Sequence, residues 1–209
     1  ARLIYTSSPS VVFDGRDQRG VDESTPYPRR WLCHYARSKA LAEQAVLGSN
    51  GRSGLATCAL RPHLIWGPGD RHLVPRLLAR ARAGRLRMIG SGRNLIDMVY
   101  IDNAAAAHLA AADRLLGSNA PAAPGGRAYF ISQGEPAPCW PWINEILALV
   151  HLPPVRRRLP LAVAWALGAL CETIYASLGL RREPPMTRFV AQQLGRSHYF
   201  DISAARRDL

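Results

Sequence analysis

The pattern of apolar and polar positions divides the first third of the chain into a strand, a loop, a helix and a second strand. The apolar run at residues 2–6, RLIYT, predicts a buried strand, and residues 14–30, rich in glycine, proline and charge, predict a loop. Residues 32–48 carry apolar side chains at helical spacing, and residues 55–61, LATCALR, predict another buried strand. This succession favours a parallel sheet with a right-handed crossover.

The remaining residues continue the alternation of short strands and helices. Asp102 is a good N-cap and marks the start of a helix through AAAAHLAAADRLL. Residues 117–126 predict a loop, and the final ARRDL predicts no closing element. The other elements expected are helices near 72–84 and 140–150 and strands near 86–90, 98–101 and 128–132.

The apolar stretch at 159–180 raises the question of a membrane. Its uncharged run, residues 159–171, contains 13 residues and ends at Glu172. A membrane-spanning helix needs about 20 residues. The stretch therefore predicts either a core or lid helix, or an interfacial helix that contacts a membrane peripherally between the arginines at 156–158 and 181–182.

Charge and cysteine content exclude several classes of function. The formal net charge of +12 would suit a nucleic-acid partner, but the arginines are scattered along the chain and no nucleic-acid motif with stacking aromatic residues accompanies them. We therefore expect no nucleic-acid partner. The cysteines are widely spaced, which favours a reducing, cytoplasmic compartment, and neither they nor the histidines have the spacing of a metal site.

Lys39 is the single lysine among the 27 Lys and Arg residues, and it follows Tyr35 by four positions. Side chains at this spacing lie on one face of a helix. A cation beside a phenol stabilises the phenolate, which makes the phenol a usable general acid or base. A compact ammonium can also contact a ribose hydroxyl. A surface Tyr–Lys pair is the alternative for this spacing alone.

Two serines follow the first predicted strand and add a polarising group. In a parallel sheet, the end of a strand and the helix that follows face one crevice at the carboxyl edge. A hydroxyl of Ser8 could there hydrogen-bond a substrate carbonyl, with Ser7 as the second choice. Simple capping of the strand end is the alternative role.

Four motifs in fixed order carry a family resemblance: YTSSPSVVFDG, DESTPYP, YARSKALAEQAVL and LRPHLIWGPGD. They resemble the extended short-chain dehydrogenase/reductase superfamily, and GSGRNLIDMVYIDNAAAAHLAAADRL and GRAYFISQGEPAP resemble its 3β-hydroxysteroid dehydrogenase branch. Within that branch the chain resembles the sterol-4α-carboxylate 3-dehydrogenases and the bacterial 2-alkyl-3-oxoalkanoate reductases. HLIWGPGD, GRAYFIS, REPPMTRF and ARRD are most like the latter, and nearly the whole chain is covered.

The resemblance implies roles for individual residues. Ser8 matches the serine that polarises the substrate oxygen, Tyr35 the proton-transfer tyrosine, and Lys39 its partner and ribose ligand. Arg93 lies in a loop that lines the substrate pocket in family members and would pair a substrate carboxylate. The segment that packs on the nicotinamide corresponds to Pro62, His63, Leu64 and Ile65.

The resemblance also implies an α/β fold: the C-terminal part of a Rossmann-like doubly wound parallel sheet plus a smaller, mostly helical substrate-binding region. We expect residues 1–66 to form the second half of the dinucleotide-binding domain. Residues 67–209 would form the substrate-binding region, interleaved with returning Rossmann elements at roughly 98–135. No GxxGxxG turn leads from a predicted strand into a helix, as it does in the first βαβ unit, so we expect this N-terminal half, about 100 residues, to be absent. NAD and NADP both stay open as the cofactor.

The function implied is that of an NAD- or NADP-dependent oxidoreductase, with this fragment inactive alone. It would interconvert a secondary alcohol and a ketone on a lipid-like substrate, a β-hydroxy or β-keto acid such as a 2-alkyl-3-oxoalkanoate or a 4-carboxysterol. A sugar-nucleotide epimerase or dehydratase and a non-catalytic dinucleotide sensor are the alternatives. Family members commonly dimerise through helices that include the Tyr–Lys one, so a homodimer is implied as well.

Overall fold

The structure, a computed structural model, describes residues 1–116, 124–180, 182 and 184–209. Within these residues a central parallel sheet consists of β1 (Arg2–Thr6), β3 (Ala56–Pro62) and β8 (Arg127–Ile131), with β3 in the middle. All residues of β3 except Ala56 are buried, because strands flank it and helices cover it. The parallel pairing that the strand–helix–strand pattern predicts is confirmed.

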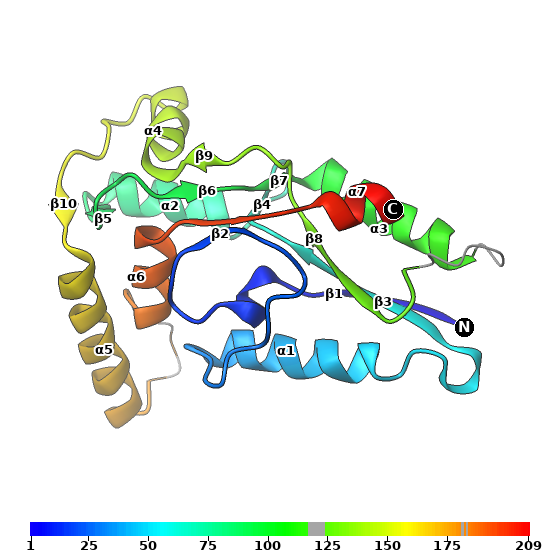
Figure 1. Ribbon diagram of the computed structural model, residues 1–209. Coiled ribbons are helices and arrows are strands. Elements are labelled where there is room, and N and C mark those ends of the chain that lie inside the picture. The colour runs from blue at the N-terminus through cyan, green and yellow to red at the C-terminus, as the bar shows by residue number, and fades with distance from the viewer. Residues whose placement is uncertain (117–123, 181, 183) are drawn as a thin grey trace.

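Helices cover both faces of this sheet. α1 (His34–Leu47) packs against β1 and β3 from one side, and α3 (Ile101–Leu116) packs against the same strands from the other (Figure 1). The α/β, Rossmann-like arrangement is therefore confirmed. α3 begins directly after β7 (Val99–Tyr100), so Asp102 lies inside the first helical turn, and its prediction as the N-cap is wrong.

A second sheet joins segments from distant parts of the chain. Its order is β2 (Gln18–Val21), β11 (His198–Phe200), β6 (Leu95–Ile96) and β9 (Ala137–Pro138). β2 lies inside the stretch 14–30, so the loop prediction is wrong for residues 18–21 and confirmed for the rest of the stretch. Its partner β11 comes from the other end of the chain, so no local pattern marks β2 as a strand.

Shorter elements surround the two sheets. The predicted loop at 117–126 falls largely on residues 117–123, which lie outside the described residues. The elements not yet named are η1 (Pro9–Val12), η2 (Arg52–Gly54), β4 (Ile65–Trp66), α2 (Leu73–Arg82), β5 (Met88–Ile89), α4 (Cys139–Leu149), β10 (Arg158–Leu159), α5 (Leu161–Ser177), α6 (Arg188–Gly195) and α7 (Ser203–Asp208).

The last described residues before Leu209 form the helix α7. The prediction that ARRDL belongs to no helix or strand is therefore wrong. Asp208 at its end is buried and accepts hydrogen bonds from Arg127 Nη1 at 2.8 Å and Tyr129 Oη at 3.0 Å. Both donors belong to β8. These tertiary bonds, which a six-residue sequence window does not reveal, tie α7 to the central sheet.

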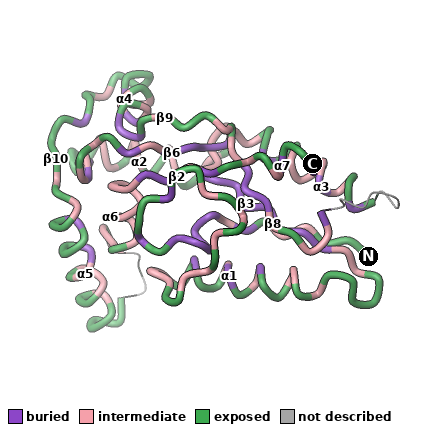
Figure 2. The backbone as a smooth tube through the Cα atoms, viewed as in Figure 1, coloured by how far each residue is buried: buried purple, intermediate pink, exposed green. Residues whose placement is uncertain are grey.

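α5, formed from the apolar stretch, contributes little to the core. Only Ala164 and Gly168 are buried among its residues, and it packs against α6 (Figure 2). Its remaining apolar side chains are half-buried or exposed, so a core position for this helix is excluded. In the part of the chain that the structure describes, no helix has the length and apolar content needed to cross a membrane.

Candidate active site

One face of α1 carries Tyr35 and Lys39, one turn apart, to the carboxyl end of β1. The Lys39 ammonium donates a hydrogen bond to the carbonyl of Thr6, the last residue of β1, at 2.8 Å. It also lies 5.0 Å from the ring centroid of Tyr5, within range of a cation–π contact. The single lysine is thus fixed at the strand end, while Tyr35 remains 53% exposed.

A buried ion pair attaches the same helix face to the sheet one turn further on. Glu43 is fully buried and accepts hydrogen bonds from Arg61 Nη2 at 2.6 Å and Arg61 Nε at 3.0 Å. Tyr27 Oη donates a third bond at 2.6 Å. Burial alone would raise the pKa of the Glu43 carboxyl, but the bonds and charge of Arg61 outweigh it and hold the pKa below its ordinary value.

The predicted polarising serine caps η1. Ser8 Oγ accepts hydrogen bonds from Ser10 Oγ at 3.0 Å and from the backbone N–H of Ser10 at 3.3 Å. Since Ser10 supplies both donors, the Ser8 hydroxyl keeps its own proton to donate to another group. Ser7 is 4% exposed and adjoins Glu43, where it helps to lower the pKa of that carboxyl.

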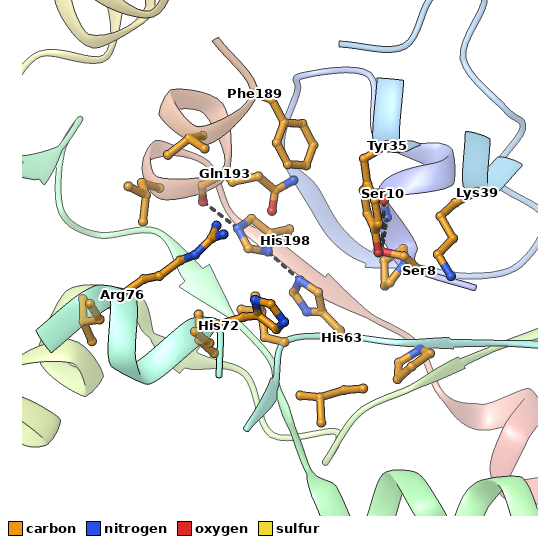
Figure 3. A pocket seen from close by; sticks show the side chains of 18 of the residues that line it. Ser8, Ser10, Tyr35, Lys39, His63, His72, Arg76, Phe189, Gln193 and His198 are labelled. Carbon is orange, nitrogen blue, oxygen red and sulfur yellow. Dashed lines mark hydrogen bonds between the residues drawn. The ribbon is translucent and has the colours of Figure 1, made fainter. Parts of the chain in front are cut away.

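A cavity of about 570 Å³ lies between these residues and the second sheet (Figure 3). Ser8, Tyr35 and Lys39 all line it, so the structure brings together the three residues predicted to be catalytic. The volume is in the range of small-molecule sites, roughly 300–1,000 Å³. Much of the wall is apolar and comes from Leu73, Leu77, Leu86, Phe189, Val190 and Leu194.

The corner after β3, predicted to pack on a nicotinamide ring, lines the same cavity. Pro62, His63, Leu64 and Ile65 all contribute to the wall. Leu64 has a φ of 42°, a left-handed conformation that a branched side chain rarely adopts. Backbone strain of this kind persists only where the surroundings fix it, and it clusters at ligand sites.

The sequence did not predict the basic wall formed by α2. His72, Arg76 and Arg80 line the cavity, and Figure 3 shows the Arg76 side chain directed into it. Arg76 and Arg80 are four positions apart, and this spacing could have indicated that they share one face of the helix. Arg93, predicted to contact substrate, does not line this cavity. No aspartate or glutamate lines it either, among the residues that the structure describes.

Buried hydrogen bonds connect two histidines behind the cavity wall. His63 Nδ1 lies 2.5 Å from Asp97 Oδ1, and His63 Nε2 lies 3.0 Å from His198 Nδ1. His198 Nε2 donates to the carbonyl of Gln193 at 2.7 Å. Burial, reinforced by His63, lowers the pKa of His198 to about 3, so His198 is neutral.

Comparison with known proteins gives a consistent family. The family model described as "3-beta hydroxysteroid dehydrogenase/isomerase family" matches residues 1–160. A 2-alkyl-3-oxoalkanoate reductase of Shewanella oneidensis is 53% identical, covering 99% of this chain and 54% of that protein. The sterol-4-alpha-carboxylate 3-dehydrogenase erg26 of Schizosaccharomyces pombe is 42% identical, covering 97% of this chain and 59% of its own length. The chain thus spans somewhat more than half of the length of these two relatives.

Solved structures share the fold. The crystal structure of gox2253 superposes with a TM-score of 0.68 at 21% identity, covering 100% of this chain and 60% of that one. At this identity the likeness concerns the arrangement of strands and helices, and it carries no information about the substrate.

Proposed function

The chain belongs to the 3-beta hydroxysteroid dehydrogenase/isomerase family, and from this membership we propose that it interconverts a secondary alcohol and a ketone with NAD or NADP. The observation that carries the proposal is the convergence of Ser8, Tyr35 and Lys39 on one largely apolar cavity. Because the chain spans little more than half of its relatives, the activity is proposed for the complete polypeptide that contains these residues.

The residues of this chain supply binding and proton transfer. Ser8 donates its remaining proton to the substrate oxygen, and Tyr35 transfers its phenolic proton to the same oxygen as the ketone is reduced. Lys39 stabilises the phenolate left behind, since its ammonium is held one helical turn away. A bound nicotinamide supplies the hydride. In the reverse direction, Tyr35 accepts the proton of a secondary alcohol.

The cavity fits such a cofactor at one end. The strained corner at 62–65 lines the same cavity as Tyr35 and Lys39, and it contributes the apolar side chains of Pro62, Leu64 and Ile65. Lys39 would hold the ribose hydroxyl, and the corner would hold the nicotinamide ring. A GxxGxxG spacing occurs at residues 48–54, but it lies between α1 and β3 and does not lead from a strand into a helix, so no pyrophosphate contact is assigned to it.

The lining supports a lipid acid as the substrate. Leucine, valine and phenylalanine side chains suit a hydrocarbon chain, and an acid is favoured because the charged side chains of the wall are basic. Two similar proteins are named for a 2-alkyl-3-oxoalkanoate and a sterol-4-alpha-carboxylate. We therefore assign a β-keto or β-hydroxy lipid acid to this site, with Arg76 replacing Arg93 as the partner of its carboxylate.

The test compares a 2-alkyl-3-oxo acid with its methyl ester in the complete polypeptide. Arg76→Gln should raise KM for the acid about tenfold and leave the ester unchanged, because only the acid loses a charge-assisted hydrogen bond. Arg82→Gln, an exposed arginine on the same helix but outside the cavity, is the matched control. Equal effects on acid and ester would remove the carboxylate assignment.

The same assay separates the alternative functions. Turnover of a nucleotide sugar with tightly held NAD would favour an epimerase or dehydratase. Cofactor binding without consumption of any ketone would favour a non-catalytic sensor. Reduction of the keto acid with stoichiometric oxidation of NADH or NADPH supports the proposed function.

We further propose a peripheral membrane contact through α5, a cytoplasmic location and a homodimer. The exposed apolar residues of α5 adjoin exposed arginines at 156–158, a combination suited to an anionic bilayer surface. The large exposed apolar residues of α5 are Val163, Trp165, Leu167, Leu170 and Ile174.

The location and the dimer rest on other observations. The cysteines of the described chain are free, as in a reducing compartment. Leu41, half exposed on α1, supports a dimer through that helix.

A further inference from the structure

The hydrogen-bonded set of Asp97, His63 and His198, here called the histidine chain, is unusually well buried for titratable groups. Asp97 is fully buried, and His63 and His198 are 6% and 3% exposed. Asp97 also accepts a hydrogen bond from the backbone N–H of Phe200 at 3.0 Å through its second oxygen. Both histidines line the cavity, but neither has a role in the proton transfer assigned to Tyr35.

The partners of each ring nitrogen fix where the protons lie. A carbonyl only accepts, so His198 Nε2 carries a proton toward Gln193. Neutral His198 then accepts at Nδ1, and His63 Nε2–H must be the donor. The contact between His63 Nδ1 and Asp97 Oδ1 needs a further proton.

That further proton belongs to His63. Asp97 already accepts the N–H of Phe200 through its second oxygen, and His198 is kept neutral by burial. His63 therefore donates from both nitrogens, as an imidazolium paired with a carboxylate. The assignment follows from the bonding partners rather than from observed hydrogens.

The histidine chain crosses the joint between the two sheets. His63 follows β3 of the central sheet and its backbone N–H donates to Ile131 of β8 at 3.0 Å. Asp97 follows β6 and His198 opens β11, both in the second sheet. The chain thus ties the corner that contains strained Leu64 to the opposite side of the cavity.

We propose that the histidine chain is a positioning device that holds the 62–65 corner against the nicotinamide through its hydrogen bonds to Asp97 and to Gln193. The inference rests on the proposed function, because it concerns the same cofactor. Gln193 lies on α6, so the chain also links the cofactor wall to the helix that supplies Phe189 and Leu194 to the substrate wall.

Two substitutions of Asp97 separate geometry from charge. Asp97→Ala leaves His63 Nδ1 without a partner and releases the corner. Asp97→Asn can donate from its amide to His63 Nδ1 and accept from the N–H of Phe200, so every bond is kept while His63 becomes neutral. Asp208→Ala is the matched control, since Asp208 is also a buried, hydrogen-bonded aspartate but lies outside the cavity.

The first measurement is the Kd of the complete polypeptide for NADH and NADPH. Asp97→Ala should raise the Kd about tenfold above that of Asp208→Ala, on the scale of a lost charge-assisted hydrogen bond. Asp97→Asn should stay near the wild-type value. Equal Kd values for the two alanine variants would overturn the proposal alone. Absence of binding by the wild type would contradict the proposed function and the proposal with it.

The second measurement is the ¹⁵N spectrum of histidine-labelled protein, which does not depend on the cofactor. Wild-type His63 should show two protonated ring nitrogens at neutral pH, and Asp97→Asn should convert it to a neutral ring protonated at Nε2. If Asp97 had only a structural role, the Asp97→Asn substitution would leave the protonation of the His63 ring unchanged. A neutral His63 in the wild type would contradict the ion pair with Asp97 and, with it, the hydrogen bonds that the proposal assigns to the histidine chain.

Discussion

At the scale of single residues, the buried pair of Glu43 and Arg61 determines where the reactive side chains lie. Glu43 shares a helix face with Tyr35 and Lys39, and Arg61 belongs to the central strand β3. A buried pair adds little stability compared with apolar residues of similar volume, but removal of one partner leaves an unpaired charge. The pair therefore fixes the position of α1 more than it stabilises the protein.

Removal of one partner should be far more costly than removal of both. Arg61→Leu is expected to lower the free energy of unfolding by about 3–5 kcal/mol, because Glu43 is left buried and unpaired. The double variant Arg61→Leu/Glu43→Leu should recover most of that loss in a urea titration. Arg19→Leu, which breaks an exposed ion pair with Asp17, should cost no more than about 1 kcal/mol. A double variant as unstable as the single one would contradict this account.

The sequence predicted some residues of the site and missed others, depending on whether a local spacing or motif marks them. The i,i+4 spacing and the family motifs were sufficient to predict that Ser8, Tyr35 and Lys39 lie together. Arg76 and His198 were missed because each reaches the cavity through tertiary packing, from α2 and from β11. The role of Arg93 was inferred from its loop alone, and that loop does not line the cavity.

At the scale of elements, hydrophobic periodicity predicted the long helices and the strands of the central sheet within a few residues. β1 matches its predicted span, and β3 and α1 differ by one or two residues at their ends. The strands β2 and β11 could not be found in this way, because each has four residues or fewer and depends on the other for its hydrogen bonds. The proposed division of the chain near residue 66 stays a prediction.

The contact between α5 and α6 depends on a glycine. A Cβ at Gly168 would lie 2.6 Å from the carbonyl carbon of Thr187 and 2.7 Å from the nitrogen of Arg188. Glycine in a helix interior normally costs roughly 0.5–1 kcal/mol relative to alanine, so replacing it would usually stabilise the protein.

Gly168→Ala should instead lower the melting temperature, since the new methyl group meets the backbone of the next helix. Ala166→Gly, on the exposed side of the same helix, serves to measure the propensity effect alone, and should destabilise by no more than about 1 kcal/mol. A rise in the melting temperature of Gly168→Ala would show that the two helices are less closely packed than described.

At the scale of the whole molecule, the surface combines an exposed apolar helix with many positively charged side chains. α5 lies along one edge of the molecule (Figure 1). Its large apolar side chains are exposed, and arginines precede it in the chain. The net charge of +12 adds a long-range attraction to anionic surfaces that salt would weaken.

Vesicle flotation tests the membrane contact. Binding to vesicles with a fifth of anionic lipid should fall several-fold in Leu170→Glu, because the substitution places a carboxylate on the apolar face of α5. Leu109→Glu, at an exposed leucine of α3, should bind as the wild type does. Equal binding by both variants would show that α5 is not the contact surface.

The measurement that tests the central claim most directly is single-turnover hydride transfer in the complete polypeptide with Tyr35→Phe. Loss of the phenolic proton donor beside Lys39 should slow reduction of the keto acid by about a hundredfold or more. The cofactor should still bind. Tyr199→Phe, in β11 and outside the cavity, should leave the rate unchanged. A wild-type rate in Tyr35→Phe would contradict the account.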